Sequence, residues 1–133
     1  MPLRHLFASL LLALGLAISS SPAAAQTHAP LLILDILPLH EGKTVADAEA
    51  YFEKVEPILA RHGMTRSDST LEVRTTVRGA IDAQVVNLWE TRDPQASFQG
   101  VFADPDYLKH AALRDSIFDL ANANILITAR RGK

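Results

Sequence analysis

The sequence predicts a single α+β domain, and three observations support this fold class. The run Leu31 to Leu37 is apolar at odd and even positions alike, which is typical of a central strand with both faces covered. From Val45 to Gly63 apolar residues recur every three or four positions, the spacing of an amphipathic helix. A strand hairpin, a second helical region and a last strand follow. The order β-α-β-β-α-β is that of a ferredoxin-like four-stranded antiparallel sheet with two helices on one face.

Residues 1–25 have the features of a secretory signal peptide. Arg4 precedes an apolar run of about 13 residues, and Ala23 to Ala25 supply a small-residue cleavage pattern. That run is short of the roughly 18 to 20 residues that span a bilayer, so a retained membrane anchor is the less favoured alternative. We therefore expect residues 26–133 to form one periplasmic or secreted domain without a stable membrane anchor.

Composition restricts the function further. The sequence holds no cysteine, which excludes disulfides, thiol catalysis and thiolate metal sites. Without Arg4, 12 basic side chains face 15 acidic ones, so nucleic acid is not an expected partner. The histidines lack the close spacing of metal ligands, and no glycine loop for phosphate is present. We predict neither a metal nor a cofactor.

The first helix has clear limits. Pro38 ends the first strand, and Thr44 is placed to cap the helix with Asp47 as its capping-box partner. Pro57 interrupts the helical pattern but falls on the polar side, so we expect a helix that continues past it. Gly63 supplies the stop.

The hairpin follows a polar, loop-like stretch from Met64 to Ser69. Apolar and polar residues alternate from Leu71 to Val77, the period of a strand with one wet face. A turn at Gly79 then leads to the strand that begins at Val85 and contains Trp89.

The second helical region contains two starts, Asp93-Pro94 and Asp104-Pro105, so we expect a break near Ala103. Its second half has one apolar arc from which two charges project. The arc consists of Tyr107, Leu108, Ala111, Ala112 and Phe118, and the charges are Arg114 and Asp115. A short strand from Ile125 to Ala129 ends the domain.

Three residues are candidates for catalysis. His62 carries an imidazole, a side chain suited to proton transfer, and lies on the inward arc of its helix, although it also suits a helix C-terminus. Asp35 lies in an apolar strand, where burial raises a carboxyl pKa unless the group forms a salt bridge, for example across a dimer. Arg114 suits a carboxylate or enolate, or it pairs with Asp115, Asp35 or Asp106.

The expected ligand-binding residues are Trp89, Tyr107, Arg114 and Asp115. Each aromatic residue offers an apolar wall with a polar tip, and the alternative for both is an ordinary place in the core.

Several short motifs resemble a bacterial domain-of-unknown-function family of the dimeric α/β-barrel superfamily and, less closely, the NIPSNAP family. They are VEPILARHG at Val55–Gly63, VVNLWE from Val85, FADPDY at Phe102–Tyr107 and LRD at Leu113–Asp115. The resemblance implies a homodimer in which a second subunit covers the other face of the sheet.

The superfamily also includes cofactor-independent monooxygenases, which often place a histidine in the helix after the third strand. Here those positions hold Phe98 and Gln99, a departure from that pattern. The fold alone specifies no reaction. Three functions stay open: binding of a small apolar or carboxylated molecule between sheet and helices, cofactor-independent monooxygenase- or isomerase-like catalysis on such a molecule, and a structural dimer without a ligand.

Overall fold

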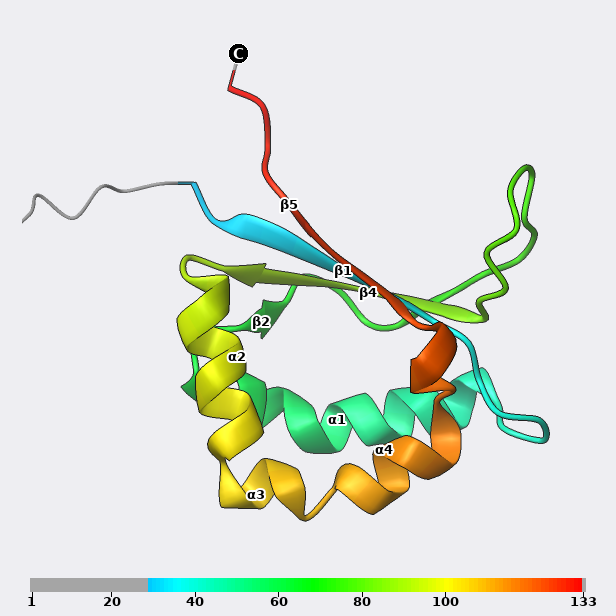
Figure 1. Cartoon of the computed structure of the whole chain (residues 1–133), viewed down its shortest axis with the longest axis horizontal. Coiled ribbons are helices and arrows are strands. Elements are labelled where there is room, and N and C mark those ends of the chain that lie inside the picture. Colours follow the sequence, from blue (N-terminus) through cyan, green and yellow to red (C-terminus); the bar gives the residue numbers. More distant parts are fainter. Residues whose placement is uncertain (1–28, 133) are drawn as a thin grey trace, which may run out of the picture.

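The computed structural model describes residues 29–132 and has one sheet with all of the described helices on one side of it (Figure 1). The predicted signal peptide lies outside the described residues. The strands are β1 (Leu31–Leu37), β2 (Thr65–Arg66), β3 (Leu71–Glu72), β4 (Val85–Thr91) and β5 (Asn124–Thr128). The helices are α1 (Val45–Arg61), α2 (Pro94–Ala103), α3 (Pro105–Leu108), α4 (Ala111–Ile117) and the short 3₁₀ turn η1 (Leu120–Asn122).

The sheet is antiparallel, with the order β2-β4-β1-β5, and β3 also pairs with β4. β1 and β4 form the centre, where Asp35 is paired with Asn87 and Ile33 with Trp89. This order confirms the predicted ferredoxin-like α+β fold class. No helix within residues 29–132 is long and apolar enough to cross a membrane.

The helix α1 begins and continues as its sequence indicates. Thr44 and Asp47 form the capping box, in which each side chain accepts a hydrogen bond from the other residue's backbone NH. Pro57 lies inside the helix with its side chain exposed, so the helix passes it as predicted. Its buried face packs on the sheet through Ala48, Tyr51, Phe52, Val55, Ile58 and Leu59.

The hairpin differs from the prediction in extent. Only Leu71 and Glu72 of the expected strand pair with β4, whereas Thr65 and Arg66, in the stretch expected to be loop, form β2. The alternating apolar and polar residues from Val73 to Val77 do not form a half-buried strand. They lie beyond the edge of the sheet, and most of their side chains are exposed. An alternating pattern alone does not show whether a neighbouring strand is present.

The second helical region breaks twice. The first break, at Asp104, is the predicted one, since Asp104 caps α3 and Pro105 begins it. The second falls at Lys109 and His110, before α4. The prediction of one continuous apolar arc in this region is therefore wrong. Tyr107 and Phe118 are buried, but Leu108 is 54% exposed.

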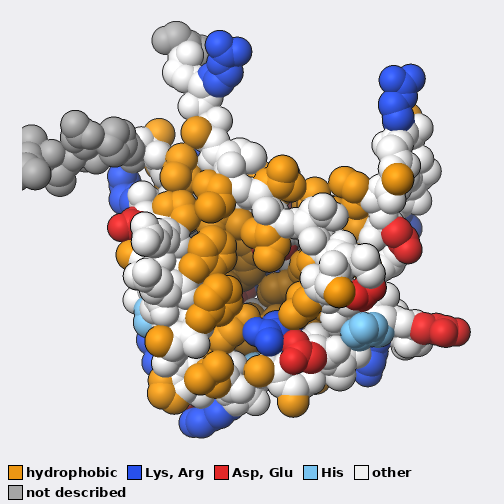
Figure 2. Space-filling view, viewed as in Figure 1, with side chains coloured by type: hydrophobic (Ala, Val, Ile, Leu, Met, Phe, Trp, Pro, Cys, Tyr) orange, Lys and Arg blue, Asp and Glu red, His pale blue; other side chains and the backbone are white. Residues whose placement is uncertain are grey.

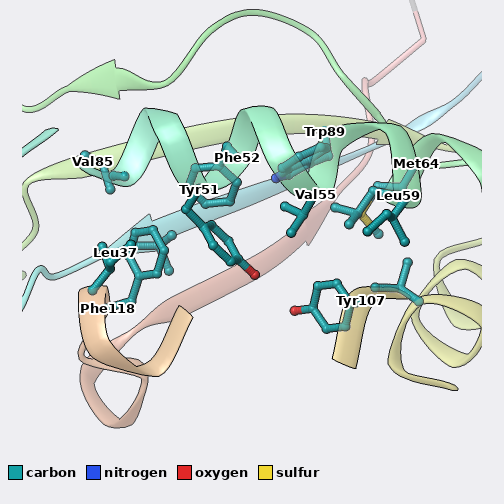
Figure 3. Close-up of a cluster of buried hydrophobic side chains, with 14 of the residues drawn as sticks. Leu37, Tyr51, Phe52, Val55, Leu59, Met64, Val85, Trp89, Tyr107 and Phe118 are labelled. Carbon is teal, nitrogen blue, oxygen red and sulfur yellow. The ribbon is translucent and has the colours of Figure 1, made fainter. Parts of the chain in front are cut away.

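The core fills the space between the sheet and α1 (Figure 3). Trp89, Phe118, Ile33, Val55 and Val85 are its most completely buried large side chains. The phenyl rings of Phe52 and Phe118 lie 5.3 Å apart and join α1 to the end of α4. Toward α3 and β5 this packing leaves a cavity.

Candidate functional site

A cavity of about 100 Å³ lies between the inner face of the sheet and the helices. In Figure 2 a hollow opens between them, surrounded by hydrophobic side chains, with a basic side chain next to an acidic one at its lower rim. Its apolar wall comes from β1, α1 and the turn after it, the α2–α4 layer, η1 and β5. It consists of Leu37, Tyr51, Phe52, Val55, Leu59, Met64, Phe98, Val101, Phe102, Tyr107, Phe118, Leu120 and Ile125. Asp35 and Arg114 are its charged lining residues.

Asp35 points into this cavity from β1. The indole Nε1 of Trp89, on the neighbouring strand β4, donates a hydrogen bond to its Oδ2 at 2.6 Å. Burial disfavours the ionised carboxyl and raises the pKa of Asp35 to about 6, although the Trp89 hydrogen bond acts in the opposite direction. The raised pKa agrees with the sequence-based expectation, and within this chain the partner of the carboxyl is the indole NH of Trp89.

Arg114 lies at the cavity wall on α4. Its Nη1 donates to the hydroxyl of Tyr107 at 3.1 Å, and its Nε donates to Asp115 at 2.9 Å. Asp115 itself is 60% exposed and does not line the cavity. Of the partners that the sequence left open for Arg114, the neighbouring Asp115 is the one observed. The guanidinium is held at the cavity and still has donors to spare.

Tyr51 is a site residue that the sequence indicates only as part of the apolar face of α1. Its hydroxyl faces that of Tyr107 in Figure 3, and burial together with Tyr107 raises the pKa of Tyr51 far above its usual range. The two hydroxyls and Arg114 form a polar strip across an otherwise apolar wall. A tyrosine on the inward arc of a helix that also contains Phe52 was the available signal, but such tyrosines are usual in cores.

Trp89 supports the cavity from behind and does not line it. Its ring lies 5.9 Å from that of Phe52, and the guanidinium of Arg66 lies 6.0 Å from the Trp89 ring. Arg66 is only 5% exposed and donates to Glu49 and Glu56 of α1. This partly buried cluster joins β2 to α1. Glu49 and Glu56, seven residues apart on one helix face, were a sequence signal for it.

His62 lies apart from the cavity. Its Nε2 is 2.7 Å from Oδ2 of Asp104, and its ring packs so closely on Gly100 that a β-carbon there would collide with it. It borders a separate open groove of about 480 Å³ near Thr91 and Ser97. The structure therefore brings Asp35, Tyr107 and Arg114 together without His62, whose contacts tie the end of α1 to α2 and α3.

The cavity combines chemistry of two kinds. Asp35 offers a carboxyl that exchanges a proton close to neutral pH, and Arg114 offers a permanent positive charge. Between them lie aromatic and aliphatic walls. Among the described residues no group of three or more histidine, aspartate or glutamate side chains is placed to hold a metal ion.

The fold matches several solved structures. SnoaB, a cofactor-independent oxygenase from Streptomyces nogalater, superposes with a TM-score of 0.57 at 20% identity over 78% of this chain and 95% of SnoaB. A NIPSNAP domain protein from Burkholderia xenovorans gives 0.60 at 11% identity over 77% and 95%.

The RPA0582 protein of unknown function from Rhodopseudomonas palustris gives a TM-score of 0.59 at 16% identity over 80% of this chain and 85% of that protein. Neither a scan of protein-family models nor a search of curated proteins gave a match. The chain thus shares the α+β fold of these structures, and at these identities the likeness concerns the fold alone.

The buried carboxyl predicts how stability depends on pH. In the unfolded chain Asp35 loses its proton near 3.8, and in the folded chain only near 6. Between these values the folded state binds more protons, so the free energy of unfolding falls as pH rises through this window, by up to about 3 kcal/mol. Asp35→Asn keeps an acceptor for Trp89 and removes the charge.

We expect that the free energy of unfolding of the Asp35→Asn variant does not show this fall with rising pH. The variant should therefore be more stable than the unchanged protein at pH 7. Urea midpoints of both proteins at pH 4, 5, 6 and 7 measure the difference, in which the other titrating groups cancel. Parallel pH profiles for the two proteins would mean that Asp35 is not the buried acid described above.

Proposed function

We propose that this protein binds a small, largely apolar molecule with an acidic group in the cavity between sheet and helices. The observation that carries this proposal is the cavity itself, whose walls are hydrophobic and whose charged lining residues are Asp35 and Arg114. Ligand sites generally combine an apolar wall with a few convergent polar groups. A cavity of about 100 Å³ suits a body no larger than one aromatic ring.

The polar groups fix the orientation of the ligand. Arg114 binds the anionic end, because its guanidinium forms paired hydrogen bonds with a carboxylate. The carboxyl of Asp35 lies on the sheet side and, in its neutral form, donates a hydrogen bond to an acceptor on the ligand. The stacked rings of Phe98 and Phe102, with centroids 5.7 Å apart, form the side wall on α2.

Arg114→Met tests the proposal. The change keeps the length and the apolar stem and removes the charge, so benzoate should lose most of its stabilising effect on thermal unfolding. Asp115 is exposed and is not left as a buried charge, so stability without ligand should change by less than about 1 kcal/mol.

The control for this variant is Arg61→Met, which removes an exposed arginine that pairs with Asp106 outside the cavity. It should bind benzoate as the unchanged protein does. The difference in thermal stabilisation between the unchanged protein and Arg114→Met should be much smaller with benzamide, the uncharged analogue, than with benzoate. Equal benzoate binding by the Arg114 and Arg61 variants would contradict the proposal.

Catalysis without a cofactor is the second candidate, and two observations favour it. Asp35 has a pKa of about 6 in an apolar cavity, as a general base requires, and the chain shares its fold with an oxygenase of this type. In this mechanism Asp35 removes a proton from the ligand and Arg114 stabilises the anion that forms. Mass spectrometry of each stabilising ligand after incubation in air separates the candidates. A ligand whose mass is unchanged supports binding. If no ligand stabilises the protein, the structural dimer is the function that remains.

We also propose that the protein is a homodimer that packs sheet to sheet. The supporting feature is the outer face of the sheet, which faces away from every described helix. Its central side chains are apolar: Leu32, Leu34, Ile36, Val86, Leu88 and Leu126. A second copy presents the same face, so a two-fold axis gives both partners equivalent cover.

Light scattering at micromolar concentration should give twice the mass of one chain. Leu34→Lys, which places a charge at the centre of the outer face, should give the mass of one chain. Leu108→Lys adds the same charge to an exposed position in the helix layer and should leave the dimer intact. A concentration-independent monomer for the unchanged protein would disprove the dimer.

Export is the remaining part of the proposed function and rests on the sequence of residues 1–25. The intact mass of the protein from a periplasmic extract should correspond to residues 26–133. Soluble protein that retains Met1 to Ala25 would contradict export with cleavage.

A further inference from the structure

Residues 74–83, which connect β3 to β4, form a projection that we call the arm. The backbone NH of Val73 donates to the carbonyl of Gln84 at 2.8 Å and closes the base of the arm. Beyond this bond the arm contains neither helix nor strand. In Figure 1 it rises from the sheet on the side opposite the helices. It therefore stands beside the outer face and not beside the cavity.

The arm has an apolar residue where a free loop would be polar. Val77 is 94% exposed, the highest value among the large hydrophobic side chains that the structure leaves exposed, and Ile81 is also exposed. A single exposed hydrophobic side chain is ordinary on a protein surface. Here it belongs to a projection next to an uncovered apolar sheet face, and that combination marks an interaction surface.

Geometry restricts what the arm can contact. Two sheets that pack face to face lie about 10 Å apart, so anything that rises from the rim of one face runs alongside the opposing chain. With two-fold symmetry each chain both extends an arm and receives one. On the outer face the pairs Leu34–Leu88 and Ile36–Val86 are apolar, and the charged Glu90, opposite Leu32, is already paired with Arg130 of the same chain, which suits a self-complementary contact better than a charged partner.

We propose that the arm docks on a second copy of this chain, with Val77 as its apolar anchor. This inference rests on the homodimer proposed above and adds a second contact to it, separate from the sheet face. The side chain of Val77 goes from nearly full exposure in one chain to burial against the partner. The two-fold symmetry produces two such contacts, so both contribute to the free energy of association.

Val77→Ser tests the arm. Removing two buried valine anchors should raise the dissociation constant of the dimer at least about tenfold, measured by sedimentation equilibrium. The folded single chain should not be affected, since Val77 is almost fully exposed there. Leu108→Ser is the matched control, a 54% exposed apolar residue on the helix layer, and its dissociation constant should equal that of the unchanged protein.

A second measurement locates the arm directly. The sequence has no cysteine, so the Val77→Cys variant carries a single thiol. Maleimide should modify it slowly above the dissociation constant and rapidly after dilution below it, whereas the Leu108→Cys variant should react at the same rate at both concentrations.

The outcomes separate the two proposals. A dimer that Val77→Ser does not weaken, with a thiol in the Val77→Cys variant that reacts rapidly at every concentration, overturns the arm and leaves the sheet-to-sheet dimer. Protection of the thiol that is independent of concentration also overturns it, because the arm then packs on its own chain. An unchanged protein that is monomeric throughout overturns the dimer and the arm together.

Discussion

The carboxyl of Asp35 is the group on which the arrangement of the cavity depends. It lies at the centre of the inner sheet face, where β1 pairs with β4, and the indole NH of Trp89 is its hydrogen-bond donor. A buried carboxyl costs free energy unless its polar atoms are satisfied, and one NH satisfies only part of it. A fold that keeps such a group usually uses it, since an apolar residue at the same place would be more stable.

The divided helical layer produces the open space above this carboxyl. A continuous helix from Pro94 to Ile117 would run straight and carry its second half away from the sheet. The breaks at Asp104 and at Lys109 turn the chain twice, so Tyr107 and Arg114 return toward α1. His62, held by Asp104 and packed on Gly100, fixes the first of these turns. Its position is therefore structural support for the cavity wall.

The two faces of β1 have separate roles. Ile33, Asp35 and Leu37 point inward, toward the helices and the cavity, while Leu32, Leu34 and Ile36 point to the open face. A ligand and a second copy of the chain would thus occupy opposite sides of one sheet without competing. The inward-facing side chains of β5 are only partly covered. Ile125 and Ile127 are 54% exposed, and no described helix covers them. Ile125 also lines the cavity.

The sequence by itself determined the fold class, the capped helix that passes Pro57, the break at Asp104 and the raised pKa of Asp35. These features depend on local patterns: residue periodicity, capping residues, proline, and a carboxyl within an apolar strand. It also named three of the residues that meet at the cavity, Asp35, Tyr107 and Arg114, since each is a polar group on an apolar element.

Only the tertiary structure decided which side chains meet. Trp89 became the partner of Asp35 through the register of β1 and β4, which leaves no trace in local sequence. The distance of His62 from the cavity, the contact of Tyr51 with Tyr107 and the short β3 likewise depend on long-range packing. Periodicity shows which face of an element is apolar, but it does not show what covers that face, because the covering residues are far away in the chain.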